Sequence, residues 1–252
     1  MQTIRTITAI AAAKLLICLS RILGNQGTAF PGRIARKIDP HILQKLAGNV
    51  KEEIYIITGT NGKTTTTNMI ARILEEKGYS FVHNRAGANM ITGITTAFIK
   101  ESDVFGKRSF EYALLETDEA NVPLLLKELT PRVVLITNFF RDQLDRYGEL
   151  DSTISLIKDA VRDTDIELVL NADDPWWYIF TMKPAYIAGI SVLSPPITMY
   201  GKMTRAGKDD FVPFARLSCN MRDSIMLSWV SFIVRIAVVR TRAETLPGII
   251  CA

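Results

Sequence analysis

A short apolar run, a glycine-rich loop and a helical pattern follow one another between residues 54 and 77. Residues 54–58 are rich in β-branched side chains and precede a glycine, which is typical of a buried strand. Residues 65–77 carry apolar side chains at helical spacing and stop before Gly78, a residue type that commonly ends helices. This order of strand, loop and helix predicts an α/β unit.

The same alternation continues along the chain. Residues 112–116, 133–137 and 167–170 are further candidate strands, and helical patterns begin near Pro123 and cover residues 152–161. Strands that alternate with helices form mainly parallel sheets covered on both faces. We therefore predict an α/β fold of the P-loop type, in which ligands bind at the carboxyl ends of the strands.

The chain divides into three parts by composition. Residues 1–50 predict a helical segment, residues 51–175 an α/β domain, and residues 176–252 a tail whose apolar spacing matches neither helix nor strand. The net charge of +4 arises from the tail, because residues 1–175 carry slightly more acidic than basic side chains. We expect no nucleic-acid partner, since no basic surface belongs to the α/β part.

Near the N-terminus, Lys14 and Arg21 interrupt the apolar sequence TITAIAAAKLLICLSRILG. The uninterrupted run is too short to span a membrane. We predict an amphipathic helix packed on the domain; a helix lying on a membrane surface is the alternative.

Cysteine usage indicates the cellular compartment. Cys18, Cys219 and Cys251 share no metal-ligand spacing and no disulfide pattern. A reduced, cytoplasmic setting follows, and zinc is not expected.

The loop GTNGKTT has the residue types that bind phosphate. Gly59 and Gly62 permit a close backbone approach, Lys63 supplies a positive charge, and Thr64 supplies a hydroxyl suited to Mg²⁺. Ile57 stands where the full G-x4-G-K-[ST] pattern would have its first glycine. A glycine turn without function is the alternative, but strand, loop and helix in this order favour nucleotide binding.

Polar side chains also follow the other predicted strands. Glu116 ends one strand and is a candidate Mg²⁺ ligand, although an acidic loop exposed to solvent is the simpler interpretation. Asn138 lies in TNFFRDQLDRYGE, and Asn171 opens NADDP, which alone indicates only a turn and a helix start. All three belong to one predicted edge of the sheet.

Together these motifs resemble the Mur ligase family, the ATP-dependent amide-forming enzymes of peptidoglycan synthesis. The resemblance is strongest to its MurT branch, the synthetase subunits of lipid II isoglutaminyl synthase. Gln143 stands where most Mur ligases have a metal-binding histidine, and residues 30–47, FPGRIARKIDPHILQKLA, are similar to that branch. The resemblance covers about residues 1–175 and implies that residues 51–175 are the family's central ATP-binding domain.

The resemblance also implies site residues and cofactors. ATP and Mg²⁺ would bind, with Lys63 and Glu116 catalytic, Thr64 and Glu116 on the metal, and Asn171 near adenine. The nucleotide would be held by Gly59, Thr60, Asn61, Gly62, Lys63, Thr64, Thr65, Asn138 and Asn171.

The implied reaction is an amidation. ATP would phosphorylate the α-carboxyl group of D-glutamate in the lipid II stem peptide, and ammonia from a glutaminase subunit of the GatD type would displace phosphate. The chain would then work in the cytoplasm, with the inner face of the membrane as the place where it meets lipid II.

The family pattern is expected to stop after Pro175. The four-cysteine zinc ribbon and the C-terminal domain of MurT proteins are not visible, and we interpret residues 176–252 as the product of a shifted reading frame or a truncated gene, with a genuine insertion as the alternative. Two functions therefore stay open: an amide ligase subunit, and a catalytically inactive nucleotide-binding fragment. Folylpolyglutamate synthetase is a third, disfavoured by Gln143 and residues 1–50.

Overall fold

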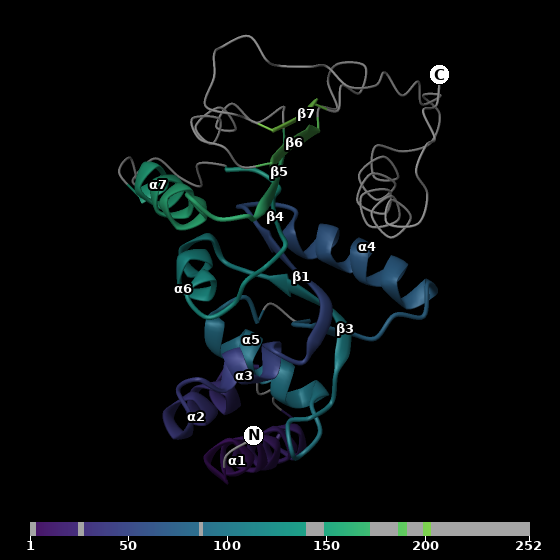
Figure 1. Ribbon diagram of the computed structural model, residues 1–252. Helices are drawn as coiled ribbons and strands as arrows, with labels where there is room; N and C mark the ends of the chain where they lie inside the picture. The colour runs from purple at the N-terminus through teal and green to yellow at the C-terminus, as the bar shows by residue number, and fades with distance from the viewer. Residues whose placement is uncertain are drawn as a thin grey trace.

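A computed structural model of the chain describes residues 4–24, 28–85, 88–139, 149–171, 186–190 and 199–202. Seven of the described segments form one sheet in the order β2-β3-β1-β4-β5-β6-β7 (Figure 1). Every neighbouring pair is parallel except β6 with β7. The strands are β1 (Val50–Thr58), β2 (Phe81–His83), β3 (Phe110–Glu116), β4 (Val133–Ile136), β5 (Glu167–Asn171), β6 (Tyr186–Ile190) and β7 (Met199–Lys202).

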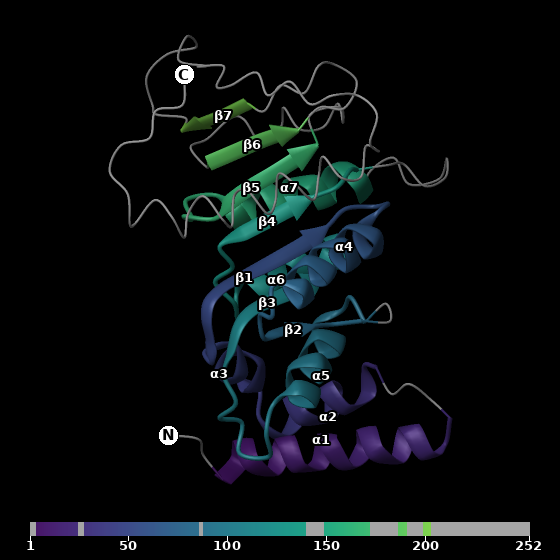
Figure 2. The same cartoon turned by 90° about the vertical axis from the view of Figure 1, so that its right-hand side faces the viewer.

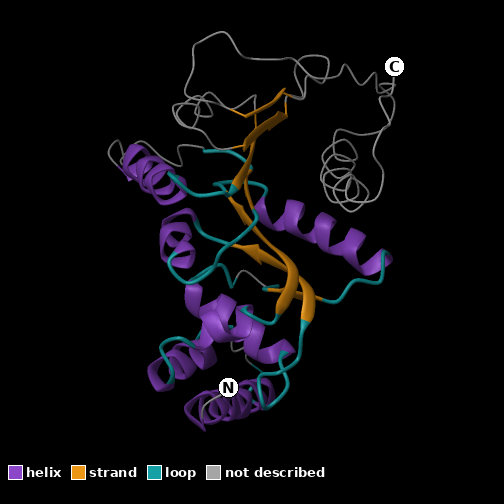
Figure 3. Ribbon diagram, in the orientation of Figure 1, coloured by secondary structure: helices purple, strands orange, loops and turns teal. Residues whose placement is uncertain are grey.

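Helices cover both faces of this sheet (Figure 3). Of the described helices, α4 packs on one face, and the others lie on the opposite face or at the β2 end of the sheet. The helices are α1 (Ile4–Ile22), α2 (Phe30–Ile38), α3 (Ile42–Ala47), α4 (Lys63–Glu76), α5 (Ile91–Glu101), the 3₁₀ turn η1 (Glu119–Asn121), α6 (Val122–Leu126) and α7 (Glu149–Val161).

Successive side chains of β1 point to opposite faces of the sheet, so this strand contributes to the core on both faces. Ile54 and Ile56 are buried in the core beneath α5, α6 and α7, whereas Ile57 faces the core beneath α4. A strand with apolar side chains on both sides belongs in the middle of a parallel sheet, where helices cover both faces. The predicted α/β fold with a mainly parallel sheet is confirmed.

The structure also differs from the prediction in the elements it contains and in how far the sheet extends. β2 and α5 were not predicted, and the strand alternation does not stop at Pro175, because β6 pairs with β5 in parallel. The assignment of residues 1–50, 51–175 and 176–252 to three separate parts stays a prediction.

The N-terminal helix α1 packs on the domain, as predicted. Ala9, Ile10 and Ala13 are fully buried, and the helix contacts α2 and α5. Among the described residues, none of the helices has the length and apolar character needed to cross a membrane.

A buried carboxylate ties α1 to α2 and α3. Asp39 is 2% exposed and accepts hydrogen bonds from Thr6 Oγ1 and Lys45 Nζ, each 2.7 Å from Oδ2. Burial alone would raise the pKa of Asp39, but the hydrogen bonds from Lys45 and Thr6 outweigh it and leave the pKa below its ordinary value. The carboxylate therefore links the N-terminal helices to one another, and their buried apolar residues belong to the same core cluster as Ile54 and Ile56 of β1.

Candidate functional site

The loop between β1 and α4 lies at the carboxyl edge of the sheet (Figure 2). Gly59 has a φ of 122° and Gly62 a φ of 83°, conformations that side chains with a Cβ rarely adopt. A Cβ on Gly59 would lie 2.3 Å from Thr137 Oγ1 and 2.8 Å from the Asn138 carbonyl oxygen. The glycine is therefore required both by its backbone angle and by the strand end packed against it.

The end of β4 fixes the shape of the loop. Thr60 N–H donates to the Asn138 carbonyl at 2.9 Å, and Asn61 N–H donates to Asn138 Oδ1 at 3.0 Å. Asn138 Nδ2 and Thr137 Oγ1 both donate to the Asn61 carbonyl, at 3.1 and 2.7 Å. The Asn138 side chain thus contacts loop backbone and helps to set the loop's shape.

Lys63, the first residue of α4, folds back over the loop. Its Nζ donates to the carbonyl oxygens of Gly59 and Thr60. Glu119 Oε2 lies 3.7 Å from the same nitrogen. Because no side chain caps α4 at Gly62, the ammonium group and the amide groups of the first helical turn together favour an anion at this position.

Thr64 and Glu116 come together beside the loop. Thr64 Oγ1 donates to Glu116 Oε1 at 3.1 Å, and Glu116 is 4% exposed. A hydroxyl and a carboxylate are hard oxygen ligands of the kind that Mg²⁺ takes next to nucleotide phosphates. These two side chains fit a magnesium ion that would bridge the loop and the end of β3.

Asn84, which the sequence analysis missed, holds the backbone of Glu116. Its Nδ2 donates to the Glu116 carbonyl at 2.7 Å, and its Oδ1 accepts from Glu116 N–H at 2.8 Å. Asn84 is 2% exposed and follows β2, a strand of only three residues. The one available signal was a polar residue directly after the short apolar run FVH.

The structure gathers most of the predicted site residues at one edge. The loop residues 59–65, Glu116 and Asn138 are connected as described above, with Thr65 exposed in the first turn of α4. Asn171 ends β5, which lies two strands from β1 in the sheet order. Gln143 lies outside the described residues.

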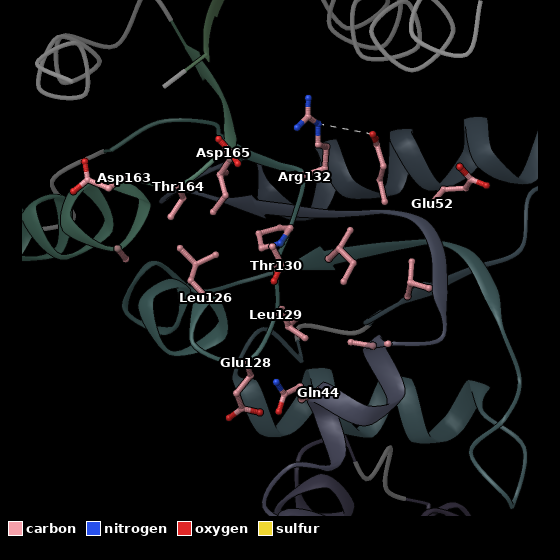
Figure 4. Close-up of a pocket in the computed structure, with 18 residues that line it drawn as sticks. Gln44, Glu52, Leu126, Glu128, Leu129, Thr130, Arg132, Asp163, Thr164 and Asp165 are labelled. Carbon is pink, nitrogen blue, oxygen red and sulfur yellow. Dashed lines mark ion pairs between the residues drawn. The ribbon is translucent and has the colours of Figure 1, made fainter. Parts of the chain in front are cut away.

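A cavity of about 830 Å³ lies at the opposite, amino edge of the sheet (Figure 4). The start of β1 lines it, together with the segments that precede β4 and β5. Arg132 Nε lies 4.0 Å from Glu53 Oε1 within it. This cavity is separate from the loop at residues 59–65 and contains none of the predicted site residues.

Comparison with known proteins assigns the family. Residues 57–195 match the Mur ligase middle domain, so the match extends beyond residue 175, where we expected it to stop. The MurT subunit of lipid II isoglutaminyl synthase (glutamine-hydrolyzing) from Staphylococcus aureus is 44% identical over 199 residues, which cover 79% of this chain and 42% of that protein. The MurT subunit from Streptococcus pneumoniae is 43% identical over 161 residues, covering 64% of this chain and 35% of that protein.

Solved structures show the same fold. MurF ligase from Thermotoga maritima, in complex with ADP, superposes with a TM-score of 0.53 at 16% identity, covering 66% of this chain and 42% of that chain. The present chain spans less than half the length of the MurT relatives described above. On the match over residues 57–195 and the 44% identity to a MurT subunit, the chain belongs to the Mur ligase family, and its parallel sheet is the family's middle domain.

Proposed function

We propose that this chain is the ATP-dependent synthetase subunit of a lipid II isoglutaminyl synthase. The observation that carries the proposal is the arrangement of Lys63, Thr64 and Glu116 around the loop at the end of β1, in a chain similar to two MurT subunits. Those relatives carry the name of the synthase, and the MurF neighbour was solved with ADP.

In the proposed reaction the α-carboxylate of D-glutamate in the stem peptide attacks the γ-phosphorus of ATP. An acyl phosphate forms and ADP leaves. Ammonia then attacks the acyl carbon. Inorganic phosphate leaves with the electron pair of the broken C–O bond and takes up the proton that the nitrogen loses, giving D-isoglutamine. Activation is needed because a free carboxylate is a poor electrophile.

The roles of the residues follow from charge. The Lys63 ammonium neutralises charge on the transferred phosphoryl group, and the amide groups of residues 59–65 hold the phosphates in line with the attacking carboxylate. Thr64 and Glu116 hold Mg²⁺, which when bound neutralises phosphate oxygens. Asn171 contacts the adenine ring.

A glutaminase subunit supplies the ammonia, and the chain works in the cytoplasm, where it meets lipid II at the inner face of the membrane. The name of the relatives includes both glutamine hydrolysis and the word subunit, which supports a two-component enzyme.

Amidation of lipid II tests this function. The chain, a glutaminase subunit, lipid II, ATP, Mg²⁺ and glutamine are combined, and amidated stem peptide is detected by mass spectrometry. We expect product from the wild type and from Lys77→Ala, an exposed lysine just after α4, and a rate at least about a hundredfold lower from Lys63→Ala. ATP binding without amidation would favour the alternative, a catalytically inactive nucleotide-binding fragment.

A further inference from the structure

One face of α1 is apolar and exposed along its whole length. The exposed residues recur every three or four positions, so they fall on one side of the helix, opposite the face buried on α2 and α5. We call this face the α1 stripe; it consists of Ile4, Thr8, Ala11, Leu15, Cys18, Leu19 and Ile22.

The large apolar side chains of the stripe are more exposed to solvent than large apolar side chains usually are on the surface of a soluble protein. Ile4 is 83% exposed, Leu15 62% and Ile22 76%, and the stripe contains no charged residue. Isolated exposed leucines are common in proteins, but a continuous apolar stripe over a 19-residue helix marks a contact surface.

The charged residues of α1 itself are of one sign. At 100° per residue, Arg5 lies on one border of the stripe and Arg21 on the other, and both are exposed. Residues 4–24 include Arg5, Lys14 and Arg21 and no acidic residue. Such a surface is complementary to a negatively charged partner, whereas a second copy of α1 would bring the same positive charges against it.

The position of α1 in the molecule leaves its outer side open to a flat surface. It lies lengthwise along the end of the molecule beyond β2, with its C-terminal end on the side to which the parallel strands point (Figure 2). A helix that lies along one end of a molecule can rest on a plane over its full length. A helix whose outward face is apolar and bordered by basic residues can bind at the interface of an anionic bilayer.

We propose that the α1 stripe binds the surface of anionic lipid bilayers and holds the protein there peripherally. Leu15, Leu19 and Ile22 insert among the lipid chains near the interface, while Arg21 contacts phosphate groups. Arg5, whose Nε donates to the Ile38 carbonyl, adds positive charge at the other border of the stripe. The proposal does not depend on the proposed amidation, because it needs neither ATP nor lipid II.

Vesicle sedimentation with the full chain tests the proposal. Vesicles of phosphatidylcholine mixed with phosphatidylglycerol are compared with vesicles of phosphatidylcholine alone. We expect binding to the mixed vesicles, weaker binding to the neutral ones, and a decrease in binding as salt is raised. Arg21→Gln should weaken binding to mixed vesicles several-fold while leaving binding to neutral vesicles unchanged.

The double variant Leu15→Glu/Ile22→Glu tests the stripe itself. It should lower binding to mixed vesicles at least about tenfold, because each substitution replaces an inserting apolar group with a negative charge. Leu124→Glu/Leu156→Glu makes the same change at two exposed leucines on α6 and α7 and should bind as the wild type does. Circular dichroism shows that the variants are folded, and Leu15→Ser/Ile22→Ser replaces the first variant if it is not.

Several results would overturn the proposal. One is a wild-type chain that stays in solution with mixed vesicles, and another is a folded stripe variant that binds them as strongly as the wild type. A third is a wild-type dimer, seen by analytical ultracentrifugation, that the stripe variant abolishes, since the stripe would then be an interface between two copies.

Discussion

Asn84 makes two hydrogen bonds to the backbone of Glu116, the proposed Mg²⁺ ligand. Asn84→Ala would leave a buried N–H and a buried carbonyl of Glu116 without partners, which costs about 2 kcal/mol of unfolding free energy. Urea denaturation measures this loss. The control Asn68→Ala changes an exposed asparagine on α4 and should shift stability by less than about 0.5 kcal/mol; equal effects of the two variants would contradict the role of Asn84.

His83 gives stability a dependence on pH. Its ring is partly buried beside Phe81, and its Nδ1 has no hydrogen-bond partner among the described residues. Burial, helped by the charge of Arg85, lowers the pKa of His83 from 6.5 to about 4. Between these two values the unfolded chain binds a proton that the folded chain does not, so stability falls as pH falls through this window.

We expect the free energy of unfolding at about pH 5 to be lower than at about pH 7 because of His83, by on the order of 1 kcal/mol after allowance for its partial exposure. His83→Gln should reduce this pH dependence, and His41→Gln, at an exposed position, should retain it because His83 is still present. Denaturant midpoints at the two pH values provide the measurement. An unchanged slope in His83→Gln would show that other groups cause the dependence.

From the sequence the loop and Asn138, which holds its backbone, were predicted, but Asn84, which holds Glu116, was missed. Gly59, Lys63 and Thr64 are adjacent in a recognisable pattern, and Glu116 and Asn138 directly end or follow predicted strands. The contact of Asn84 with Glu116 joins residues 32 positions apart, and nothing local in the sequence encodes it. Residues that support a site through long-range contacts become visible only in the fold.

Among the elements, α2 and α5 approach closely at Gly32. A Cβ on Gly32 would lie 2.0 Å from the Thr92 carbonyl oxygen, and Gly32 N–H donates to Thr96 Oγ1 at 2.9 Å. Gly32→Ala must separate the two helices, and we expect a loss of about 1–3 kcal/mol in unfolding free energy.

Gly48→Ala is the matched control for this contact. Gly48 has a helical φ of −62°, and its added Cβ would have no neighbour closer than 3.5 Å. Thermal or urea denaturation should show Gly48→Ala as neutral or slightly stabilising. If the two alanine variants unfolded at the same denaturant concentration, the close packing of α2 on α5 would be wrong.

The elements that were predicted carry clear sequence signals, and those that were missed do not. The second half of β1 and most of β3, β4 and β5 are apolar runs next to turn signals, and α4 buries one face only. α5 is buried from Gly93 to Ile99, so its sequence ITGITTAFIKE has no polar face to mark a helix. β2 has three residues, too few to establish a strand period.

In the whole molecule, different surfaces lie at different ends of the sheet. The loop and Glu116 lie at the carboxyl edge, the cavity that includes Arg132 lies at the amino edge, and α1 lies beyond β2 (Figure 1). The proposed nucleotide site and the proposed lipid contact therefore use separate surfaces. Variants of the α1 stripe should leave the affinity for ATP unchanged within about twofold, as calorimetric titration would show, since they lie outside the loop.

Calorimetric titration of the intact chain with ATP in the presence of Mg²⁺ tests most directly whether the loop at residues 59–65 holds a nucleotide, because it does not depend on whether the ligase reaction proceeds. We predict one site per chain, no detectable binding to Lys63→Ala, and unchanged binding to Lys77→Ala, an exposed lysine beyond the other end of α4. Omitting Mg²⁺ should weaken binding of the wild type, and Glu116→Gln should reduce that dependence on the metal. A wild-type chain that binds no ATP, or a Lys63→Ala variant that binds it equally well, would show that this loop is not a nucleotide site.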